Sequence, residues 1–334
     1  MKCNYCSKTA VKYRRYSGEY LCKSCFMKSV EKKVQKVISK YDMLKEDSRT
    51  AVGVSGGKDS SVLLYILDTL EKRFPKAELI AVTVDEGIAG YRDESLKNAR
   101  SIAKALSIEH AVVSFKNLFG VRLDELAKIV EEDKESVSTC AHCGVLRRNA
   151  LNQAAKMVEA DRLATAHNLD DEAQTVLMNI IRSDTVRIVR TAPLMDSQPE
   201  FVPRIKPLRE IPERETTLYA YYKDISIPTA VCPYASEALR NDIRTFLNDM
   251  EEKHPEVKYN LLRSADQIRE SLAPFATMNA SQLRTCQVCG APTSKRICKT
   301  CKLLRKIQCS TTLNLNNGNP RSDKISVPKK TLIG

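Results

Sequence analysis

The sequence SGGKDS, at residues 55–60, lies between an apolar β-type run at 50–54 and a helix-like run at 61–67. A strand that leads through a glycine turn into a helix gathers backbone N–H groups and the positive end of the helix dipole, which together bind phosphate. The Walker sequence G-x-x-x-x-G-K-[ST] is excluded, because Val52 occupies the place of its first glycine and Asp59 follows Lys58. We therefore expect another class of phosphate loop, and the alternative is a glycine turn that binds nothing.

The length and composition of the chain limit its class. Its 334 residues are enough for two domains, or for one large core with appendages. The polar start and the lack of an apolar run of membrane length predict a soluble, cytoplasmic protein that does not bind membranes. Ten of the twelve cysteines fall in C-x-x-C pairs, which indicates reduced thiols and metal sites rather than a disulfide framework.

The net charge of +13 is concentrated at the two ends of the chain. Residues 1–45 carry twelve Lys or Arg against three Asp or Glu, and residues 284–334 carry eleven against one. The ends therefore hold +9 and +10, which leaves −6 for residues 46–283. Two basic ends around an acidic body favour a polyanionic partner such as nucleic acid, although Lys-rich faces are often only solvated.

Two sets of paired cysteines have the spacing of closed structural zinc sites with four thiolates each. The first set is Cys3, Cys6, Cys22 and Cys25, and the second is Cys286, Cys289, Cys298 and Cys301. Such small modules lack the apolar bulk to fold alone, and bound zinc can supply roughly 10–16 kcal/mol. We expect an N-terminal knuckle with a linking helix at 1–45 and a C-terminal knuckle at 284–309. The Asn-rich stretch at 310–334 has no periodic apolar face and is predicted to be disordered.

Between the knuckles, apolar runs alternate with helical patterns. Strands are predicted at 50–54, 79–84, 110–115 and 162–166, and helices at 60–73, 91–106, 120–135, 143–158 and 170–181. This alternation is typical of an α/β protein with a doubly wound parallel sheet. We expect a catalytic domain at 46–208, followed at 209–283 by a mostly helical continuation that carries Cys232 in a proline loop.

Two further segments are expected at the carboxyl edge of this sheet, where α/β proteins bind ligands. Residues 83–88 end a strand and can offer backbone groups to adenine. The second segment, ATAHNLDDEAQT at 164–175, places two aspartates at the start of a helix. These carboxylates can cap the helix and also hold Mg²⁺ on a triphosphate. Capping alone explains one aspartate, but it explains less well why His167 and two aspartates lie together.

The body also contains three cysteines outside the knuckles, Cys140, Cys143 and Cys232. Three thiolates leave one metal position open, and a [4Fe–4S] cluster with one exposed iron fits this count. Two other readings remain open. Cys140 and Cys232 could pass a persulfide or form a disulfide during turnover, or the three cysteines could be unrelated. Arg147 and Arg148, one helical turn on, could face phosphates or solvent.

Taken in order, these motifs resemble the tRNA 2-thiouridine synthetases, a family of PP-loop ATP pyrophosphatases. The resemblance runs from Cys3 to about Cys301 and rests on both knuckles, SGGKDS, AHNLDDEAQT, CxxCGVLRR and the cysteine of CPY. This group contains the archaeal and eukaryotic cytosolic wobble-uridine enzymes and the thermophile ribothymidine-thiolating enzymes. The tail after Cys309 matches nothing known in the family.

The resemblance implies a reaction. Members adenylate O2 of a tRNA uridine, and sulfur bound at the cluster then expels AMP to give 2-thiouridine. For this chain, the wobble uridine U34 is favoured as the target over the T-loop uridine U54. The implied cofactors are ATP, Mg²⁺, a [4Fe–4S] cluster and two Zn²⁺. The implied partners are tRNA, a sulfur donor and a second copy of the chain, the donor being a ubiquitin-like thiocarboxylate carrier or free sulfide. The alternatives are a 2-thiocytidine-type thiolase and a non-enzymatic RNA-binding iron–sulfur scaffold.

The resemblance also implies site residues. Positions that bind ATP in the family match Gly53, Val54, Ser55, Asp59, Val84, Ala166 and Asp171, to which the loop residues Gly56, Gly57, Lys58 and Ser60 are added. Cys140, Cys143 and Cys232 match the cluster ligands. Asp59 is expected to serve adenylation, and Asp171 matches an acidic residue needed for activity. Arg147 stands where some members carry a catalytic lysine, and a guanidinium keeps the charge but cannot shuttle a proton.

Overall fold

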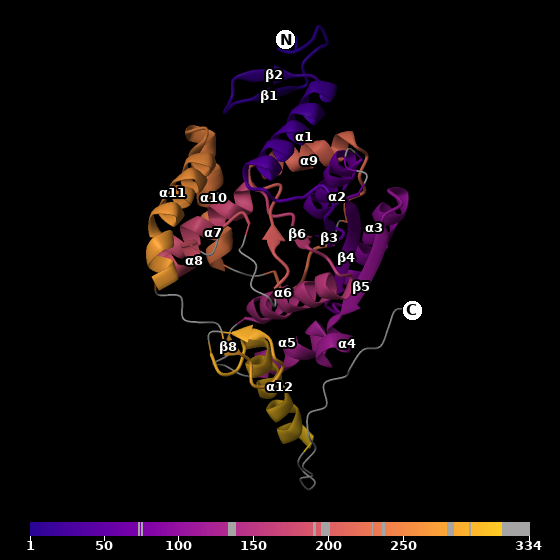
Figure 1. Cartoon of the computed structure of the whole chain (residues 1–334), viewed down its shortest axis with the longest axis vertical. Helices are drawn as coiled ribbons and strands as arrows, with labels where there is room; N and C mark the ends of the chain where they lie inside the picture. Colours follow the sequence, from indigo (N-terminus) through magenta and orange to yellow (C-terminus); the bar gives the residue numbers. More distant parts are fainter. Residues whose placement is uncertain are drawn as a thin grey trace.

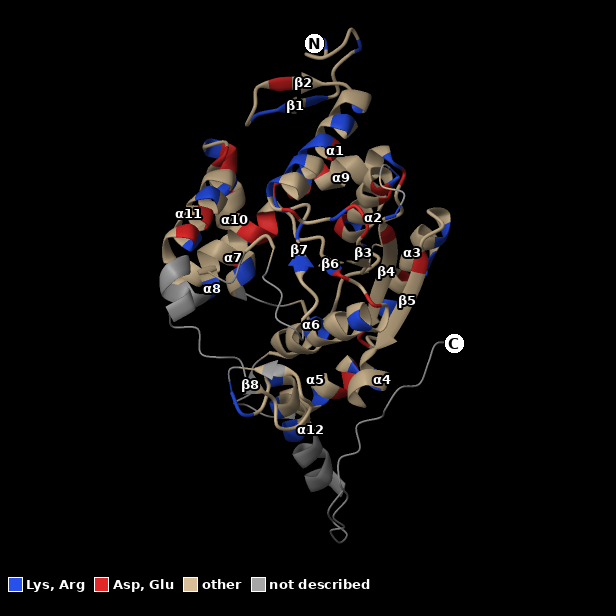
Figure 2. Ribbon diagram, viewed as in Figure 1, with Lys and Arg blue, Asp and Glu red and all other residues tan. Residues whose placement is uncertain are grey.

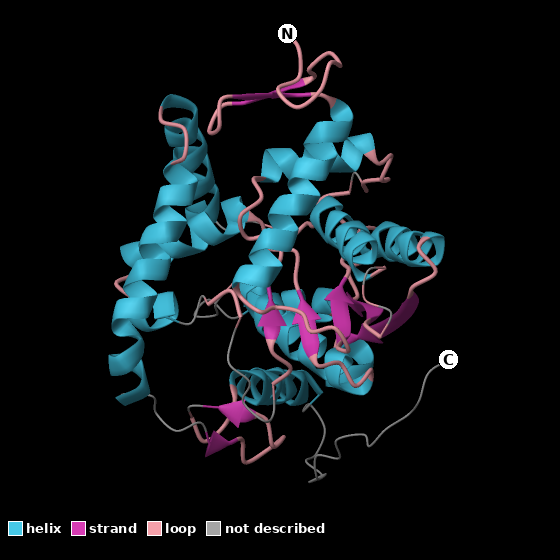
Figure 3. Cartoon of the chain, turned by 45° about the horizontal axis from the view of Figure 1, so that its top comes forward, coloured by secondary structure: helices cyan, strands magenta, loops and turns pink. Residues whose placement is uncertain are grey.

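The computed structural model describes residues 1–72, 74, 76–132, 138–189, 192–194, 201–228, 230–235, 238–278, 284–293 and 295–315. Its centre is a five-stranded parallel sheet in the order β5-β4-β3-β6-β7 (Figures 1 and 3). The strands are β3 (Arg49–Gly53), β4 (Glu78–Asp85), β5 (Glu109–Ser114), β6 (Arg162–Ala164) and β7 (Arg204–Ile205). The chain winds outward from β3 in one direction and from β6 in the other, which confirms the doubly wound α/β prediction.

Helices cover both faces of this sheet. They are α1 (Lys23–Lys40), α2 (Lys58–Glu71), α3 (Arg92–Ala105), α4 (Phe115–Phe119), α5 (Leu123–Glu132), α6 (Thr139–Met157), α7 (Leu169–Ile181), α8 (Thr185–Val189), α9 (Glu213–Tyr222), α10 (Ala238–Lys253), α11 (Val257–Met278) and α12 (Lys299–Leu315). In the described part of the chain, none of these helices is long and apolar enough to cross a bilayer.

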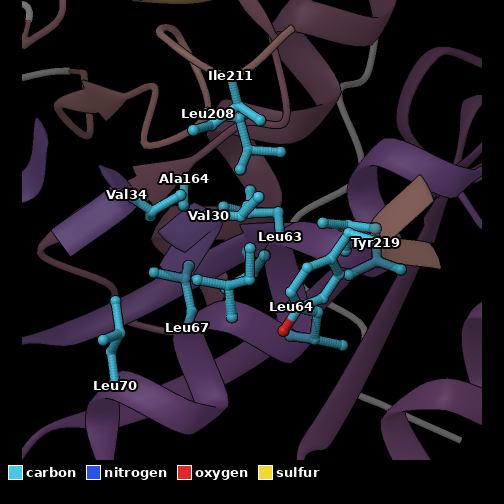
Figure 4. Packing of buried hydrophobic residues seen from close by; sticks show 14 of the residues in the cluster. Val30, Val34, Leu63, Leu64, Leu67, Leu70, Ala164, Leu208, Ile211 and Tyr219 are labelled. Atoms are coloured by element: carbon cyan, nitrogen blue, oxygen red, sulfur yellow. The ribbon is translucent and has the colours of Figure 1, made fainter. Parts of the chain in front are cut away.

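The two faces follow from side chains that alternate along the strands. Val52 and Ala81 point into a core shared with α1, α2, α3 and α9, whereas Ala51 and Ile80 point into a core shared with α5, α6 and α12. Figure 4 shows side chains of α1, α2 and α9 gathered in the first core beside Ala164 of β6. Because both faces are covered, the strands read as continuous apolar runs.

The N-terminal module is fastened to this body by buried polar contacts. It consists of β1 (Lys12–Arg14), β2 (Glu19–Leu21) and the start of α1. The Nε of Arg14 lies 2.8 Å from Oε1 of Glu215 on α9, and the hydroxyl of Tyr219 donates to Glu31 of α1 at 2.8 Å. Further along, the ammonium of Lys33 lies 4.6 Å from the ring centroids of both Tyr16 and Tyr259. The first knuckle is therefore part of the folded body and not an appendage on a linker.

The C-terminal module packs on the opposite face of the sheet. Its two short strands, β8 (Arg284–Thr285) and β9 (Pro292–Thr293), precede α12, which packs against α5 and α6. Leu303 and Ile307 of α12 are buried in the core that also contains Cys143 of α6. Figure 1 shows the two modules at opposite ends of the molecule. The helices α10 and α11 pack instead on α7 and α8 at the side of the sheet.

Several predicted boundaries were wrong for local reasons. Phe115 begins α4 instead of ending a strand, because the side chain of Ser114 caps that helix. The helix predicted at 143–158 begins four residues earlier, after the cap residue Ser138. The short strand β7 was not predicted. The stretch 310–315 continues α12 and is not disordered, and residues 316–334 lie outside the described residues.

A buried ion pair offers a test of this packing. Arg209, with a side chain 1% exposed, donates to both carboxylate oxygens of Asp266 on α11. The Asp266→Ala variant leaves the guanidinium buried and uncompensated, so its free energy of unfolding should fall by about 3–5 kcal/mol in a urea titration. Glu78→Ala is the control, since Glu78 is 55% exposed and pairs with Arg49 at the surface. It should cost about 1 kcal/mol or less, and equal losses in the two variants would contradict this interpretation.

Candidate functional site

The phosphate loop lies between β3 and α2, and its conformation requires glycine. Gly56 has a φ of +86°, and a Cβ at this position would overlap the carbonyl oxygen of Ser95 on α3. Gly57 has an ordinary φ of −83° as the N-cap of α2, where a Cβ would meet only the Ser55 hydroxyl, 3.5 Å away. Only the first of the two glycines is therefore required by both backbone and space.

Hydrogen bonds hold the loop in this shape. The hydroxyl of Ser60 accepts from the Ser55 amide at 3.1 Å and donates to the Gly57 carbonyl at 2.9 Å. From α3, Arg92 donates to the Ser55 carbonyl at 2.9 Å, and Asn98 donates to the Gly56 carbonyl. Apart from the Ser55 amide, these bonds use side chains and loop carbonyls, so the first amides of α2 stay directed beyond the helix end.

The charged residues of the loop are held by α9. Lys58 Nζ lies 2.8 Å from Asp59 Oδ2 and 2.9 Å from Oε1 of Glu213. The buried hydroxyl of Thr216 donates to the other carboxylate oxygen of Asp59. Sequence reasoning missed Glu213 and Thr216, which lie more than 150 residues from the loop. No local pattern distinguishes them, because their importance comes from where α9 packs.

A third carboxylate, Asp171, faces the same loop from α7. Its side chain and that of Asn168 accept each other's backbone amide hydrogens, so the two form a capping box. Burial, reinforced by the negative charges of Asp59 and Glu213, raises the pKa of Asp171 to about 6. Asp171 thus caps the helix and also lies in an electronegative site beside the phosphate loop.

The neighbours of Asp171 have other environments. Asp170 accepts from Lys258 of α11 and from the Glu213 amide at 2.7 Å, so its buried carboxylate joins α7, α9 and α11. The exposed His167 has its Nδ1 3.1 Å from the Thr165 hydroxyl. Of the two aspartates, Asp170 therefore has a structural role and Asp171 is the one that faces the loop.

Three of the predicted ATP-binding positions lie at the strand ends beside the loop. Gly53 ends β3, Val84 is the next-to-last residue of β4, and Ala166 follows β6. The three strands are neighbours in the sheet, with β3 between β4 and β6. The carboxyl edge of the sheet therefore brings these positions together, at the point where the winding direction reverses.

The three cysteines of the body lie on the other side of the same edge. Cys140 and Cys143 occupy the first turns of α6, and Cys232 packs against the apolar core that contains Cys143. The loop of Cys232 is anchored to α5 by the Tyr234 hydroxyl, which donates to Asp124 at 2.8 Å. The structure thus brings Cys143 and Cys232 to one apolar core, with Cys140 three residues before Cys143 on α6.

The surroundings of Cys143 disfavour a free thiolate. Burial, together with Glu86 and the other two cysteines, raises the pKa of Cys143 to about 12, although the positive charge of Arg147 opposes this rise. A bound metal would offset this cost by stabilising the charge of the thiolate.

The two knuckles differ from these cysteines in geometry. Among the described residues, only the two four-cysteine sets bring all their candidate ligand atoms within 4.8 Å of one another. In the first set the Cys22 sulfur caps α1, and in the second the Cys298 sulfur accepts from the Cys301 amide at 3.3 Å. Such closed sets fit a single tetrahedral ion, whereas each thiolate of an iron–sulfur cluster binds a different iron and the sulfurs lie further apart.

A buried ion pair joins the loop to the thiols. Arg92, which holds the Ser55 carbonyl, also donates to the Val84 carbonyl and places its Nε 2.9 Å from Oε2 of Glu86. The other oxygen of Glu86 lies 3.9 Å from Arg147, one turn after Cys143. Sequence reasoning missed Glu86 and Arg92, although a buried charge directly after a strand is a signal for such a contact.

Comparisons with known proteins agree with this arrangement. Residues 26–251 match the family model of the PP-loop domain, and residues 2–27 match that of the N-terminal LIM domain of the 2-thiouridine synthetase TtuA. The tRNA 2-thiolation protein NcsA of Haloferax volcanii is 39% identical, over 92% of this chain and 99% of the relative. The cytoplasmic tRNA 2-thiolation protein 1 of Chlamydomonas reinhardtii is 36% identical, over 96% and 86%.

Among solved structures, the U34-tRNA thiolase NcsA from Methanococcus maripaludis with its [4Fe–4S] cluster is similar, with a TM-score of 0.79 and 33% identity. The match covers 97% of this chain and 99% of that one. Both the sequence and the whole fold are thus shared with these relatives, and the chain belongs to the PP-loop family and, within it, to the tRNA 2-thiolation proteins.

Proposed function

We propose that the protein is an ATP-dependent tRNA thiolase that adenylates O2 of a uridine and replaces this oxygen with sulfur. The observation that carries the proposal is the line of contacts from the phosphate loop to the thiols, through Arg92, Glu86 and Arg147. This arrangement supports a common site for the group that activates the base and the group that delivers sulfur, at one edge of one sheet. The names of the relatives, tRNA 2-thiolation proteins, support the same reaction.

ATP is proposed to bind with its phosphates on the loop and its adenine against the strand ends at Gly53, Val84 and Ala166. Lys58 and the first amides of α2 stabilise the pyrophosphate as it leaves. Asp171, together with Asp59, holds Mg²⁺, because these carboxylates face the loop and leave it electronegative.

Sulfur transfer is assigned to the other side of the edge, at Cys140, Cys143 and Cys232. A [4Fe–4S] cluster bound by these three thiolates supplies an iron that can hold sulfur. A uracil oxygen is a poor leaving group, and bonding it to AMP makes it a good one. Arg147, which lies beside Cys143 and Glu86, supplies positive charge to the phosphate of the adenylate but cannot shuttle a proton.

The remaining assignments concern cofactors and partners. We assign one Zn²⁺ to each four-cysteine knuckle, because the sulfur atoms already converge there. Lys and Arg follow β1, α1 and α12 at opposite ends of the molecule (Figure 2), and these basic ends are proposed to hold the tRNA backbone. The solved relative is a U34-tRNA thiolase, which favours the wobble uridine here. A cytoplasmic location, a homodimer and a thiocarboxylate or sulfide donor complete the proposal.

The function is tested with purified protein, ATP, sulfide and tRNA under anaerobic conditions. The expected result is release of AMP and pyrophosphate that depends on tRNA, and 2-thiouridine in the digested tRNA by mass spectrometry. A tRNA with cytidine in place of U34 should give no product. If that tRNA is still thiolated, and thiolation is lost instead when U54 is replaced, the target lies in the T-loop.

The two loop glycines should differ sharply on substitution. Gly56→Ala forces a Cβ into the Ser95 carbonyl at positive φ, so ATP binding should weaken by at least about 100-fold, which is about 2.8 kcal/mol. Gly57→Ala has room for its Cβ and should change the affinity only a few-fold. Calorimetric titration with ATP measures both, and circular dichroism checks the fold. Equal effects would mean that the described loop is not the one that binds ATP.

Cys232→Ser should separate the two halves of the site. The variant should lose iron, sulfide and thiolation, because one of three cluster ligands is removed, while its ATP affinity stays within about twofold. Asp59→Asn is the reciprocal variant and should lose AMP formation but retain iron and sulfide. Elemental analysis and the visible spectrum measure the cluster. A Cys232→Ser protein with full iron content would show that this cysteine is not a ligand.

A further inference from the structure

The first turn of α9 contacts two distant parts of the protein. On one side, Glu213 and Thr216 contact Lys58 and Asp59 of the phosphate loop. On the other side, Glu215 pairs with a residue of the N-terminal module. Successive helical residues are about 100° apart, so Glu215 lies on nearly the opposite side of the helix from Glu213 and about a quarter turn from Thr216. One helical turn therefore lies between the knuckle module and the ATP loop and touches both.

The contact with the N-terminal module is built from buried charge. Arg14 Nε lies 2.8 Å from Oε1 of Glu215, and its Nη2 lies 3.1 Å from Oε2, so the pair is bidentate. The two side chains are 6% and 2% exposed. The Tyr16 hydroxyl donates to the same carboxylate at 2.7 Å. A bidentate pair fixes the orientation of both partners as well as their distance.

Arg14 is itself held rigidly within the module. It lies on β1, which pairs with β2, and Cys22 of the first knuckle follows directly after β2. Its Nη2 also donates to Ser29 of α1 at 2.8 Å. A shift of the hairpin relative to α1 therefore moves the guanidinium, and the carboxylate of Glu215 has to follow.

We propose that the Arg14–Glu215 pair is a positioning pair for the ATP site, through which the N-terminal knuckle module holds α9 and so sets Lys58 and Asp59 for the phosphates. The module then does more than contribute basic surface for RNA, because its position is coupled to nucleotide binding. The inference rests on the proposed use of the loop for ATP, but not on the identity of the thiolated base.

The test measures nucleotide affinity without tRNA. The Arg14→Gln variant should bind ATP about tenfold more weakly than the unaltered protein, a coupling of the usual size between two sites. Arg14→Lys should fall between the two, because an ammonium keeps the charge but cannot form two parallel bonds. Arg15→Gln is the matched control, since it removes the same charge from an exposed position on the same hairpin. Its ATP affinity should be unchanged.

Amide hydrogen exchange measured by mass spectrometry gives a second readout. Arg14→Gln should speed exchange at 55–61 as well as within residues 12–33, whereas a purely local role would affect only the latter. Tyr16→Phe removes a single hydrogen bond to the Glu215 carboxylate, so it should weaken ATP binding two- to threefold. This milder variant keeps the test valid even if the Arg14 variants unfold at the assay temperature. Unchanged ATP affinity and unchanged exchange at 55–61 in the folded variants would overturn the proposal.

These outcomes are distinct from failure of the proposed function. If the protein thiolates no uridine, the affinity and exchange measurements still report on the coupling. If the unaltered protein does not bind ATP, the proposed function itself fails before the coupling is examined.

Discussion

The site depends on the buried guanidinium of Arg92. It holds the carbonyl groups of Ser55 and Val84, and therefore the ends of two adjacent strands, and it pairs with the equally buried Glu86. A charge in this environment is stable only while every partner is in place, because a buried ion without its partner costs several kcal/mol. The phosphate loop, the end of β4 and the start of α3 are thus held as one rigid unit.

The charged side chains around this unit form two groups, one at the phosphate loop and one near the thiols. Asp59 and Glu213 pair with Lys58 at the loop and Asp171 lies near both carboxylates, whereas Arg147 lies near Cys143. Burial, together with the charges of Asp59 and Glu213, raises the pKa of Asp171. In the proposed reaction, the carboxylates would hold the divalent cation of the nucleotide, and Arg147 would face the anionic sulfur species and the phosphate of the adenylate. This edge of the sheet thus presents negative charge at the phosphate loop and positive charge near the thiols.

The two knuckle modules support different halves of this edge. The first contacts α9, which holds Lys58 and Asp59, and the second packs through α12 on α6, which carries Cys140 and Cys143. Each module is small and brings four cysteine sulfur atoms within 4.8 Å of one another, so an ion bound there would make it a rigid support for the helix that it touches. Their similar cysteine patterns therefore lead to different structural tasks.

The sequence by itself determined the parallel sheet, the phosphate loop and the grouping of the cysteines, because each is encoded in neighbouring residues. Alternating apolar runs specify strands, the glycines of SGGKDS specify a turn in which Gly56 has a positive φ, and C-x-x-C spacing indicates which sulfurs gather in the two four-cysteine sets. The candidate residues Ser55, Asp171 and Cys232 came from motifs of the same local kind.

Only the tertiary structure revealed the contacts of Glu213, Thr216, Arg14 and Glu86. These side chains come from segments far apart in the chain, and an isolated glutamate or arginine in a helix reads as an ordinary solvated residue. Their importance arises from burial, which strengthens a charge pair and penalises its loss, and burial is decided by how α9 and the N-terminal hairpin pack on the sheet.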